Sequence, residues 1–336
     1  MESPQDAVHG LGNVLIVGGC GLVGHALVRF LIENGKPEGE ISDVSAVIKL
    51  TNPKVIINFA SPDPMNPDKS VFGKCNIVGV QNIIECAQEQ GVPVLVHSSS
   101  CEIIQDAYHD LIWANEEWPV QDSPVNGSIY AKTKAIGEEL VLSANRQKGL
   151  LTVAIRLCTT FGEGDNGLTR QFIELGKKGM SKYQIGPGQN LYDFIYAGNA
   201  AEGHLLAAQI LLHPNLSPGD KRIDGEAFNM TNGDPWRFWD AARFVSNAAG
   251  YPVKEEQVWK LPMAVVCLLA QIWGFMYALF TLGGEPEVQA KMLRYTGMVR
   301  TFDITKARGR LGYKPRVSME DGLRRAVRWH LERAKK

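Results

Sequence analysis

Residues 13–24 read NVLIVGGCGLVG, a short apolar run that is closed by glycines and followed at once by a helical pattern. The run predicts a buried strand, and the apolar spacing of LVGHALVRFLIENG (22–35) predicts an amphipathic helix. Small residues at Gly18, Gly21 and Gly24 permit a tight turn and let backbone N–H groups approach a pyrophosphate. Between a strand and a helix, these glycines predict a dinucleotide site rather than a turn in which glycine only satisfies backbone geometry.

The alternation of strand and helix continues along the first half of the chain. Helical spacing is seen in VSAVIKLTN, NIVGVQNIIECAQEQG and YAKTKAIGEELVLSANRQ, whereas KVIINFAS, PVLVHSSS and LTVAIRLC read as apolar, β-branched strands. Repeated βα units predict an α/β fold with a doubly wound parallel sheet of the Rossmann type. We expect a Rossmann domain over residues 12–180 and a smaller substrate lobe over residues 181–336.

Composition argues against several classes of function. The chain has 336 residues, a formal net charge of -1 and 45% hydrophobic residues, values that are ordinary for a globular enzyme. No long run of Lys or Arg provides the positive surface that nucleic acid requires. The six cysteines are scattered, so we expect neither a disulfide framework nor a metal site. The first twelve residues lack the apolar core of a secretory signal, so we expect a protein that faces the cytosol.

Residues 261–284, LPMAVVCLLAQIWGFMYALFTLGG, carry no charged side chain and are long enough to span a bilayer. Gln271 and Gly274 interrupt the apolar run, and Trp273 and Tyr277 favour the membrane interface, so a helix or hairpin in the headgroup region is an alternative to a span. A third interpretation is a buried roof over an apolar pocket. We favour membrane contact.

Two further motifs indicate chemistry on a hydroxyl group. Tyr130 and Lys134 are four residues apart in YAKTK, which on a helix places the phenol and the ammonium on one face. A nearby positive charge lowers the pKa of a phenol toward the range of a general base. The serines of SSS (98–100) end a strand, where a hydroxyl can bind a substrate oxygen. Each motif alone is common, but their order after a glycine loop on a βα chain is specific.

In these motifs and over nearly its whole length the chain resembles the extended short-chain dehydrogenase/reductases. Within them it is similar to the 3β-hydroxysteroid dehydrogenase group, and in that group to the decarboxylating sterol dehydrogenases of fungi. The stretches that carry the resemblance are NFASPDPMNPD, KCNIVGVQNII, ANEEWPVQDSPVNGSIYAKTKAIGEELVLSAN, KYQIGPGQNLYDFIYAGNAAEGHLLAAQ and FDITKARGRLGYKPRVSMEDGL. One departure is Leu157, which follows Arg156 where the group usually has proline.

The resemblance implies catalytic roles for three residues. Tyr130 would act as the base, Lys134 would lower the pKa of Tyr130 and hold the cofactor ribose, and Ser100 would orient the substrate oxygen, with Ser99 as the alternative. The implied reaction removes the proton of a 3β-hydroxyl as hydride passes to the nicotinamide. The resulting 3-ketone accepts the electrons released when the neighbouring 4α-carboxylate leaves as CO2, so the reaction needs no metal.

The resemblance also implies the cofactor and the partners. Gly18, Gly21 and Gly24 would contact the pyrophosphate of NAD, with NADP not excluded, and Ala60, Tyr130 and Lys134 would line the cofactor cleft. The substrate would be a sterol or a similar steroid. An apolar substrate gives the segment 261–284 a reason to lie at a membrane, which predicts the cytosolic face of the endoplasmic reticulum. A homo-oligomer is possible.

One part of the expected domain has no counterpart in the sequence. The group places a strand ending in Asp, a helix and a third strand after the first helix, whereas here GEIS (39–42) runs directly into DVSAVIKL. Roughly 25 residues, one strand-helix-strand unit, are missing. In the strand order 3-2-1-4-5-6 the second and third strands lie outside the first, so NVLIVGG becomes an edge strand that is open to aggregation or self-pairing. Asp43 could bind the adenosine ribose, but we favour a role as a helix cap.

Three functions are compatible with the sequence. The first is NAD-dependent oxidation and decarboxylation of a 4α-carboxysterol in sterol biosynthesis. The second keeps the chemistry and changes the substrate, as in a tailoring dehydrogenase for a steroid or terpenoid. The third is a truncated, catalytically inactive isoform that keeps Ser100, Tyr130 and Lys134 but does not hold the cofactor.

Overall fold

The computed structural model describes residues 11–34, 44–106, 108–120, 128–219, 222–281 and 290–334. At its centre lies a five-stranded parallel sheet in the order β1-β2-β3-β5-β10. The strands are β1 (Val14–Val17), β2 (Val55–Asn58), β3 (Val94–Ser100), β5 (Leu151–Leu157) and β10 (Glu226–Met230). All residues of β2 and β3 are buried, as apolar runs in a doubly covered sheet require. The predicted α/β fold with a parallel sheet is confirmed.

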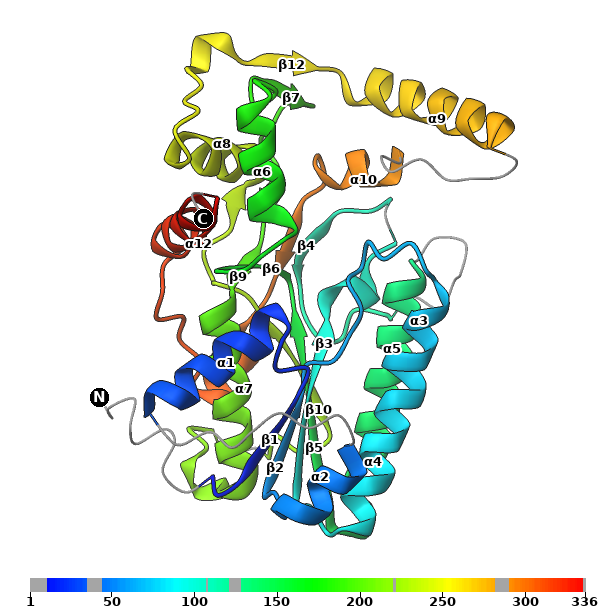
Figure 1. Ribbon diagram of the computed structural model, residues 1–336, viewed down its shortest axis with the longest axis vertical. Helices are drawn as coiled ribbons and strands as arrows, with labels where there is room; N and C mark the ends of the chain where they lie inside the picture. Colours follow the sequence, from blue (N-terminus) through cyan, green and yellow to red (C-terminus); the bar gives the residue numbers. More distant parts are fainter. Residues whose placement is uncertain are drawn as a thin grey trace.

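Helices cover both faces of this sheet (Figure 1). On one face α4 and α5 pack on the strands with α2 beside α4, and on the other face lie α1 and α7. The helices are α1 (Leu22–Asn34), α2 (Val44–Thr51), α4 (Val80–Glu89), α5 (Ile129–Ser143) and α7 (Ala197–Leu212), with α3 (Ser70–Gly73) and a π-helix (Lys74–Gly79) leading into α4. Local chemistry sets their ends: Ser128 caps α5 by accepting a hydrogen bond from the Ala131 N–H, and Gly91 follows α4 at a φ of +68°.

Strand β1 lies at the edge of the sheet, and no described strand pairs with its outer side. Its four residues are only partly buried, unlike those of β2. For the part of the chain that the structure describes, the prediction that NVLIVGG forms an edge strand is confirmed. Asp43 and the GEIS stretch (39–42) lie outside the described residues, so the predicted role of Asp43 as a helix cap stays a prediction.

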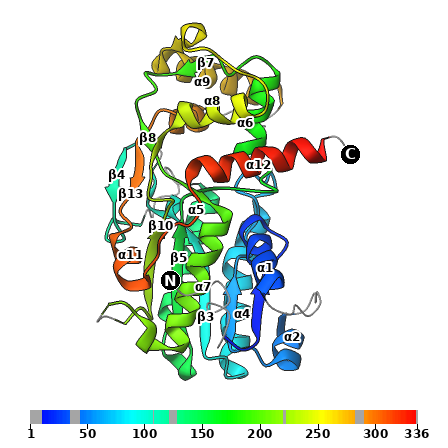
Figure 2. The same cartoon turned by 90° about the vertical axis from the view of Figure 1, so that its left-hand side faces the viewer.

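A smaller four-stranded sheet, in the order β11-β8-β13-β4, and two two-stranded pairs lie beyond the carboxyl ends of the large sheet (Figure 2). The strands are β4 (Leu111–Ala114), β8 (Leu191–Tyr192), β11 (Trp236–Arg237) and β13 (Arg300–Phe302), with the pairs β6 (Thr159–Phe161) and β9 (Phe194–Tyr196), and β7 (Tyr183–Ile185) and β12 (Trp259–Leu261). The helices of this region are α6 (Leu168–Lys177), α8 (Phe238–Ala248), α10 (Ala290–Tyr295), α11 (Thr305–Leu311) and α12 (Met319–Arg333). The division near residue 180 stays a prediction, and α7 and β10, which come later, return to the large sheet.

Helix α9 (Met263–Phe280) extends from β12 away from the sheet (Figure 1). It is long and apolar enough to cross a membrane, with a mean hydropathy of 2.0, and Cys267 is its one buried residue. The large apolar side chains that it exposes are Val265, Leu268, Leu269, Ile272, Trp273, Phe275, Met276, Leu279 and Phe280. The interpretation of this segment as a buried roof is therefore wrong, because the helix packs on α10 and leaves most of its surface uncovered.

Candidate active site

The glycine loop joins β1 to α1, and two of its glycines, Gly18 and Gly24, have a steric reason to lack a side chain. Gly18 adopts a φ of +83°, and a Cβ there would lie 2.6 Å from the backbone nitrogen of Ala60. A Cβ on Gly24 would lie 2.2 Å from the carbonyl oxygen of Gly18, so Gly24 lets α1 pack closely on the loop. Gly18 and Gly24 therefore fix the turn and the helix that follows it.

Gly21 occupies a more open position. A Cβ there would meet only the Gly18 carbonyl oxygen, at 3.3 Å, while the Gly21 N–H closes the turn by donating to that oxygen at 3.0 Å. The next residue begins α1, whose first backbone N–H groups and positive dipole end favour an anion. The loop thus has the space and the donors that a pyrophosphate needs, and these residues fit a bound dinucleotide.

Ala60 lies beside the glycine loop, as its predicted place in the cofactor cleft requires. Its N–H donates to Asn58 Oδ1 at 3.0 Å, and Asn58 Nδ2 lies 3.2 Å from His97 Nδ1 on the neighbouring strand. Asn58 thereby fixes the backbone at the end of β2 against β3. The structure brings Ala60 and Gly18 into contact, and their role in binding NAD stays a prediction.

Ser100 ends β3 and meets Tyr130, which lies in the first turn of α5. The Tyr130 hydroxyl makes hydrogen bonds with the hydroxyls of Ser100 and Ser61, and Ser100 Oγ also accepts from the Glu102 N–H at 3.1 Å. Ser99 Oγ is buried and has no hydrogen-bond partner among the described residues. Ser100, and not its alternative Ser99, is therefore the serine that the structure places beside the tyrosine.

Lys134 lies one turn after Tyr130 on α5, and its side chain is buried. Its ammonium donates to the Ser98 carbonyl oxygen at 2.5 Å, and burial lowers the pKa of Lys134 to about 8. Burial raises the pKa of Tyr130 to about 12, with the two serine hydroxyls opposing this rise. The lowering of the Tyr130 pKa by Lys134 stays a prediction, because Lys134 is not among the main influences on that pKa here.

Sequence reasoning missed Ser61 in the site and Asn76, which supports α5. Ser61, whose hydroxyl reaches Tyr130, ends the apolar run KVIINFAS as Ser100 ends PVLVHSSS, so the argument used for SSS could have found it. Asn76 in the π-helix donates from Nδ2 to Thr133 Oγ1 at 3.0 Å, and a Cβ on Gly137 would lie 2.5 Å from the Asn76 carbonyl oxygen. A π-helix at such a site has no sequence signal of its own.

A buried ion pair holds α5 against β5. The Arg156 guanidinium donates to the Glu138 carboxylate, with Nη2 and Oε1 2.6 Å apart, and both side chains are almost fully buried. Strand β5 continues through Leu157, which pairs with Ser100 on one side and Met230 on the other. Leucine in place of proline therefore extends the ladder up to Ser100.

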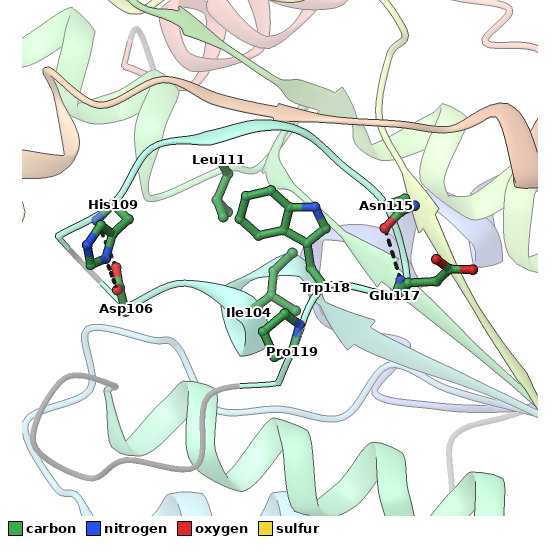
Figure 3. A pocket seen from close by; sticks show the side chains of 8 residues that line it. All are labelled: Ile104, Asp106, His109, Leu111, Asn115, Glu117, Trp118 and Pro119. Carbon is green, nitrogen blue, oxygen red and sulfur yellow. Dashed lines mark hydrogen bonds and ion pairs between the residues drawn. The ribbon is translucent and has the colours of Figure 1, made fainter.

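A cavity of about 560 Å³ lies beyond the short helix η2 (Cys101–Ile104) that follows Ser100. Figure 3 shows apolar side chains across its middle and polar groups at both ends. Its lining residues are Ile104, Asp106, His109, Leu111, Asn115, Glu117, Trp118 and Pro119. The cavity thus belongs to the segment between Ser100 and Tyr130, and none of the predicted site residues lines it.

Residues 38–263 match the model of a family described as the 3-beta hydroxysteroid dehydrogenase/isomerase family. Ser100, Tyr130 and Lys134 lie within the match, whereas the glycine loop precedes it. The chain is 35% identical to sterol-4-alpha-carboxylate 3-dehydrogenase, decarboxylating, of Saccharomyces cerevisiae, over 95% of this chain and 98% of the relative. The human protein of that name is 29% identical over 95% of this chain and 89% of its own. The yeast alignment runs over 353 positions, more than the 336 residues here, so the relative contains residues without a counterpart in this chain.

Solved structures share the fold. An epimerase from Methanothermobacter thermautotrophicus has a TM-score of 0.71 at 20% identity, over 99% of this chain and 96% of the other. The dTDP-glucose 4,6-dehydratase DesIV from Streptomyces venezuelae, solved with NAD bound, has a TM-score of 0.68 at 21% identity, over 96% of this chain and 98% of the other. At these identities the likeness concerns the Rossmann-type architecture alone.

Proposed function

Because the chain belongs to the 3-beta hydroxysteroid dehydrogenase/isomerase family, we propose that it oxidises the 3β-hydroxyl of a 4α-carboxysterol to the 3-ketone, with NAD as cofactor and with loss of CO2. The observation that carries this function is the meeting of Ser100 and Tyr130 at the carboxyl end of β3, with Lys134 one turn along α5. An alcohol placed there would have a hydrogen-bond donor and a proton acceptor on its oxygen.

The chemistry divides among these residues. Ser100 orients the substrate hydroxyl, and Tyr130 accepts its proton as the C–H bond at the same carbon is broken. NAD, when bound by the glycine loop, supplies the hydride acceptor. In the 3-ketone the bond to the carboxylate breaks, its electron pair moves toward the carbonyl oxygen, and CO2 leaves. A proton then returns to the ring carbon, so the second step needs no further oxidant.

The exposed apolar surface of α9 supports attachment to a membrane. Its exposed side chains include Leu268 at 56%, Leu269 at 60% and Phe275 at 70%, and such a surface is stable against lipid rather than water. We infer that α9 places the protein on the cytosolic face of the endoplasmic reticulum, where an apolar sterol partitions.

In this arrangement residues 12–180 supply the cofactor domain and residues 181–336 supply the substrate lobe. The open edge of β1 offers a surface for a homo-oligomer.

One observation favours a second function, that of an inactive isoform. The strand that would carry the carboxylate for the adenosine ribose does not flank β1 in the described part of the chain. A glycine loop on an edge strand has lost the support of that neighbour, and a loop that moves binds a dinucleotide less tightly.

The deciding experiment compares this chain with a version that carries the missing strand-helix-strand unit from the yeast relative. NAD binding is measured by calorimetry, and conversion of a 4α-carboxysterol to the 3-ketone is followed by mass spectrometry in detergent micelles. The proposed function requires NAD-dependent ketone and CO2 from this chain, lost in Tyr130→Phe. Activity in the restored version alone would establish the inactive isoform, and activity in neither would exclude the sterol assignment.

A further inference from the structure

Arg300 on β13 is a buried cation close to the active site, and the proposed reaction gives it no role. Its guanidinium is 4% exposed, and it makes hydrogen bonds to three side chains. Nη2 donates to Glu102 Oε1 at 2.6 Å, Nε donates to Gln105 Oε1 at 3.0 Å, and Nη1 donates to the Tyr192 hydroxyl. Since a guanidinium has five N–H donors, these three bonds leave capacity for a further acceptor.

Glu102 connects this cation to the catalytic hydroxyls. Its N–H donates to Ser100 Oγ at 3.1 Å, and its carboxylate binds Arg300. The Glu102 charge also contributes to the raised pKa of Tyr130, so the carboxylate acts on the same hydroxyl that receives the substrate. Glu102 is 28% exposed, in contrast to its partner, and so has room to turn toward solvent.

The chemistry of the substrate gives this pair a function. In a 4α-carboxysterol the carboxylate and the reacting hydroxyl are attached to neighbouring ring carbons. When the hydroxyl meets Ser100 and Tyr130, the carboxylate lies beside these residues, and the turn that carries Glu102 directly follows Ser100. Two carboxylates repel each other there, unless a cation is shared or one of them is displaced. Arg300 presents the planar donor group that suits a carboxylate.

We propose that Arg300 is the residue that recognises the substrate carboxylate, and that Glu102 occupies Arg300 in the free protein and gives way when the sterol binds. The inference rests on the proposed function, because only a carboxylated substrate brings an anion to this place. Glu102 and Arg300 are thus specificity residues, while the ketone-forming step belongs to Ser100 and Tyr130.

The test measures binding without NAD, so that no turnover occurs. Affinities for a 4α-carboxysterol and for the matching 4α-methylsterol are determined by tryptophan fluorescence in micelles, for the native chain, Glu102→Gln and Arg300→Lys. Glu320→Gln, which weakens a similar carboxylate–Arg324 pair on the exposed surface of α12, is the matched control.

Glu102→Gln should raise the preference for the carboxysterol by about 3- to 10-fold, and Arg300→Lys should lower it by about 10-fold or more. Glu320→Gln should leave the preference unchanged. If Arg300→Lys does not fold, as judged by circular dichroism, Glu102→Gln decides. An unchanged preference in Glu102→Gln, or a native chain that binds neither sterol, overturns the inference. The proposed function is tested by a separate measurement. It fails if a chain that binds the carboxysterol forms no ketone when NAD is added.

Discussion

The buried ammonium of Lys134 donates a hydrogen bond to the backbone carbonyl of Ser98, with the nitrogen and oxygen atoms 2.5 Å apart. This contact joins α5 to β3, the two elements that carry Tyr130 and Ser100. Burial lowers the pKa of Lys134 to about 8, so in this protein an alkaline pH removes the charge that an exposed lysine would keep.

Lys134→Met should change how the stability depends on pH. The folded-state pKa of Lys134 is about 8 and its ordinary value is 10.5, so between these values the unfolded chain binds more protons than the folded one. Stability of the native chain therefore rises with pH across this window, relative to the variant, by up to about 3 kcal/mol. Denaturant unfolding in micelles at pH 7.5 to 10.5 measures the difference, and parallel curves for the two proteins would contradict it.

Tyr130→Phe should lower the rate of ketone formation by about 10²- to 10⁴-fold, because it removes the proposed proton acceptor and leaves the ring in place. The affinity for NAD should change little. Steady-state rates and an NAD titration on the same preparation separate the two effects. Tyr183→Phe on β7, where the ring lies near Lys182, is the matched control and should retain full activity. An equal loss of rate in Tyr130→Phe and Tyr183→Phe would show that Tyr130 is not the proton acceptor.

Gly24→Ala should destabilise the protein by about 1 to 3 kcal/mol and weaken NAD binding, because the new methyl group would lie 2.2 Å from the Gly18 carbonyl oxygen. Gly309→Ala on α11 is the control, since a Cβ there meets nothing within 4 Å, and alanine in a helix should stabilise it by up to about 1 kcal/mol. Thermal unfolding with and without NAD tests both. Full NAD affinity in Gly24→Ala would show that NAD binding does not need the close packing of α1 on the loop.

Glu138→Leu should cost about 3 to 5 kcal/mol in the free energy of unfolding, because it leaves the Arg156 guanidinium buried without its partner. The double variant Glu138→Leu/Arg156→Met should recover most of this loss, since neither side chain then carries a charge. Urea unfolding of the single and double variants gives the coupling energy. A double variant no more stable than Glu138→Leu would show that the pair does not act as a unit.

Leu268→Glu/Leu279→Glu should release the protein from lipid, because both leucines are exposed on α9 and a charge there opposes burial in the bilayer interface. Flotation with phosphatidylcholine vesicles measures the bound fraction. Leu216→Glu changes a leucine of similar exposure far along the chain from α9 and should leave flotation intact. Undiminished flotation of the double variant would place the lipid contact elsewhere.

Local patterns were enough to predict the parts of the site that lie on βα units. A hydrophobic pattern within a few neighbouring residues is enough to predict each of three elements. They are the apolar run before Gly18, the strand that ends at Ser100, and the helix that carries Tyr130 and Lys134. Their mutual placement follows because the carboxyl ends of parallel strands meet at one edge of a sheet.

The smaller sheet could not be predicted in this way. Its strands have two to four residues each, and β13 pairs Arg300 with Leu111, a residue far away in the sequence. Segments this short show no hydrophobic periodicity. Strands so far apart in the sequence pair only after the large parallel sheet has brought them together. The place of Arg300 near the site could therefore not be predicted from the sequence, because it depends on the neighbours that this pairing provides.

Strand β1 bears the glycine loop and also ends the described sheet, with β2 as its one described neighbour. Edge strands open locally before central ones, so the amide hydrogens of Val14–Val17 should exchange with solvent faster than those of β3. A dinucleotide bound to the loop stabilises the closed edge in proportion to its affinity for that state. Cofactor binding in this chain is therefore coupled to a local folding equilibrium, which bound NAD shifts toward the paired state of β1.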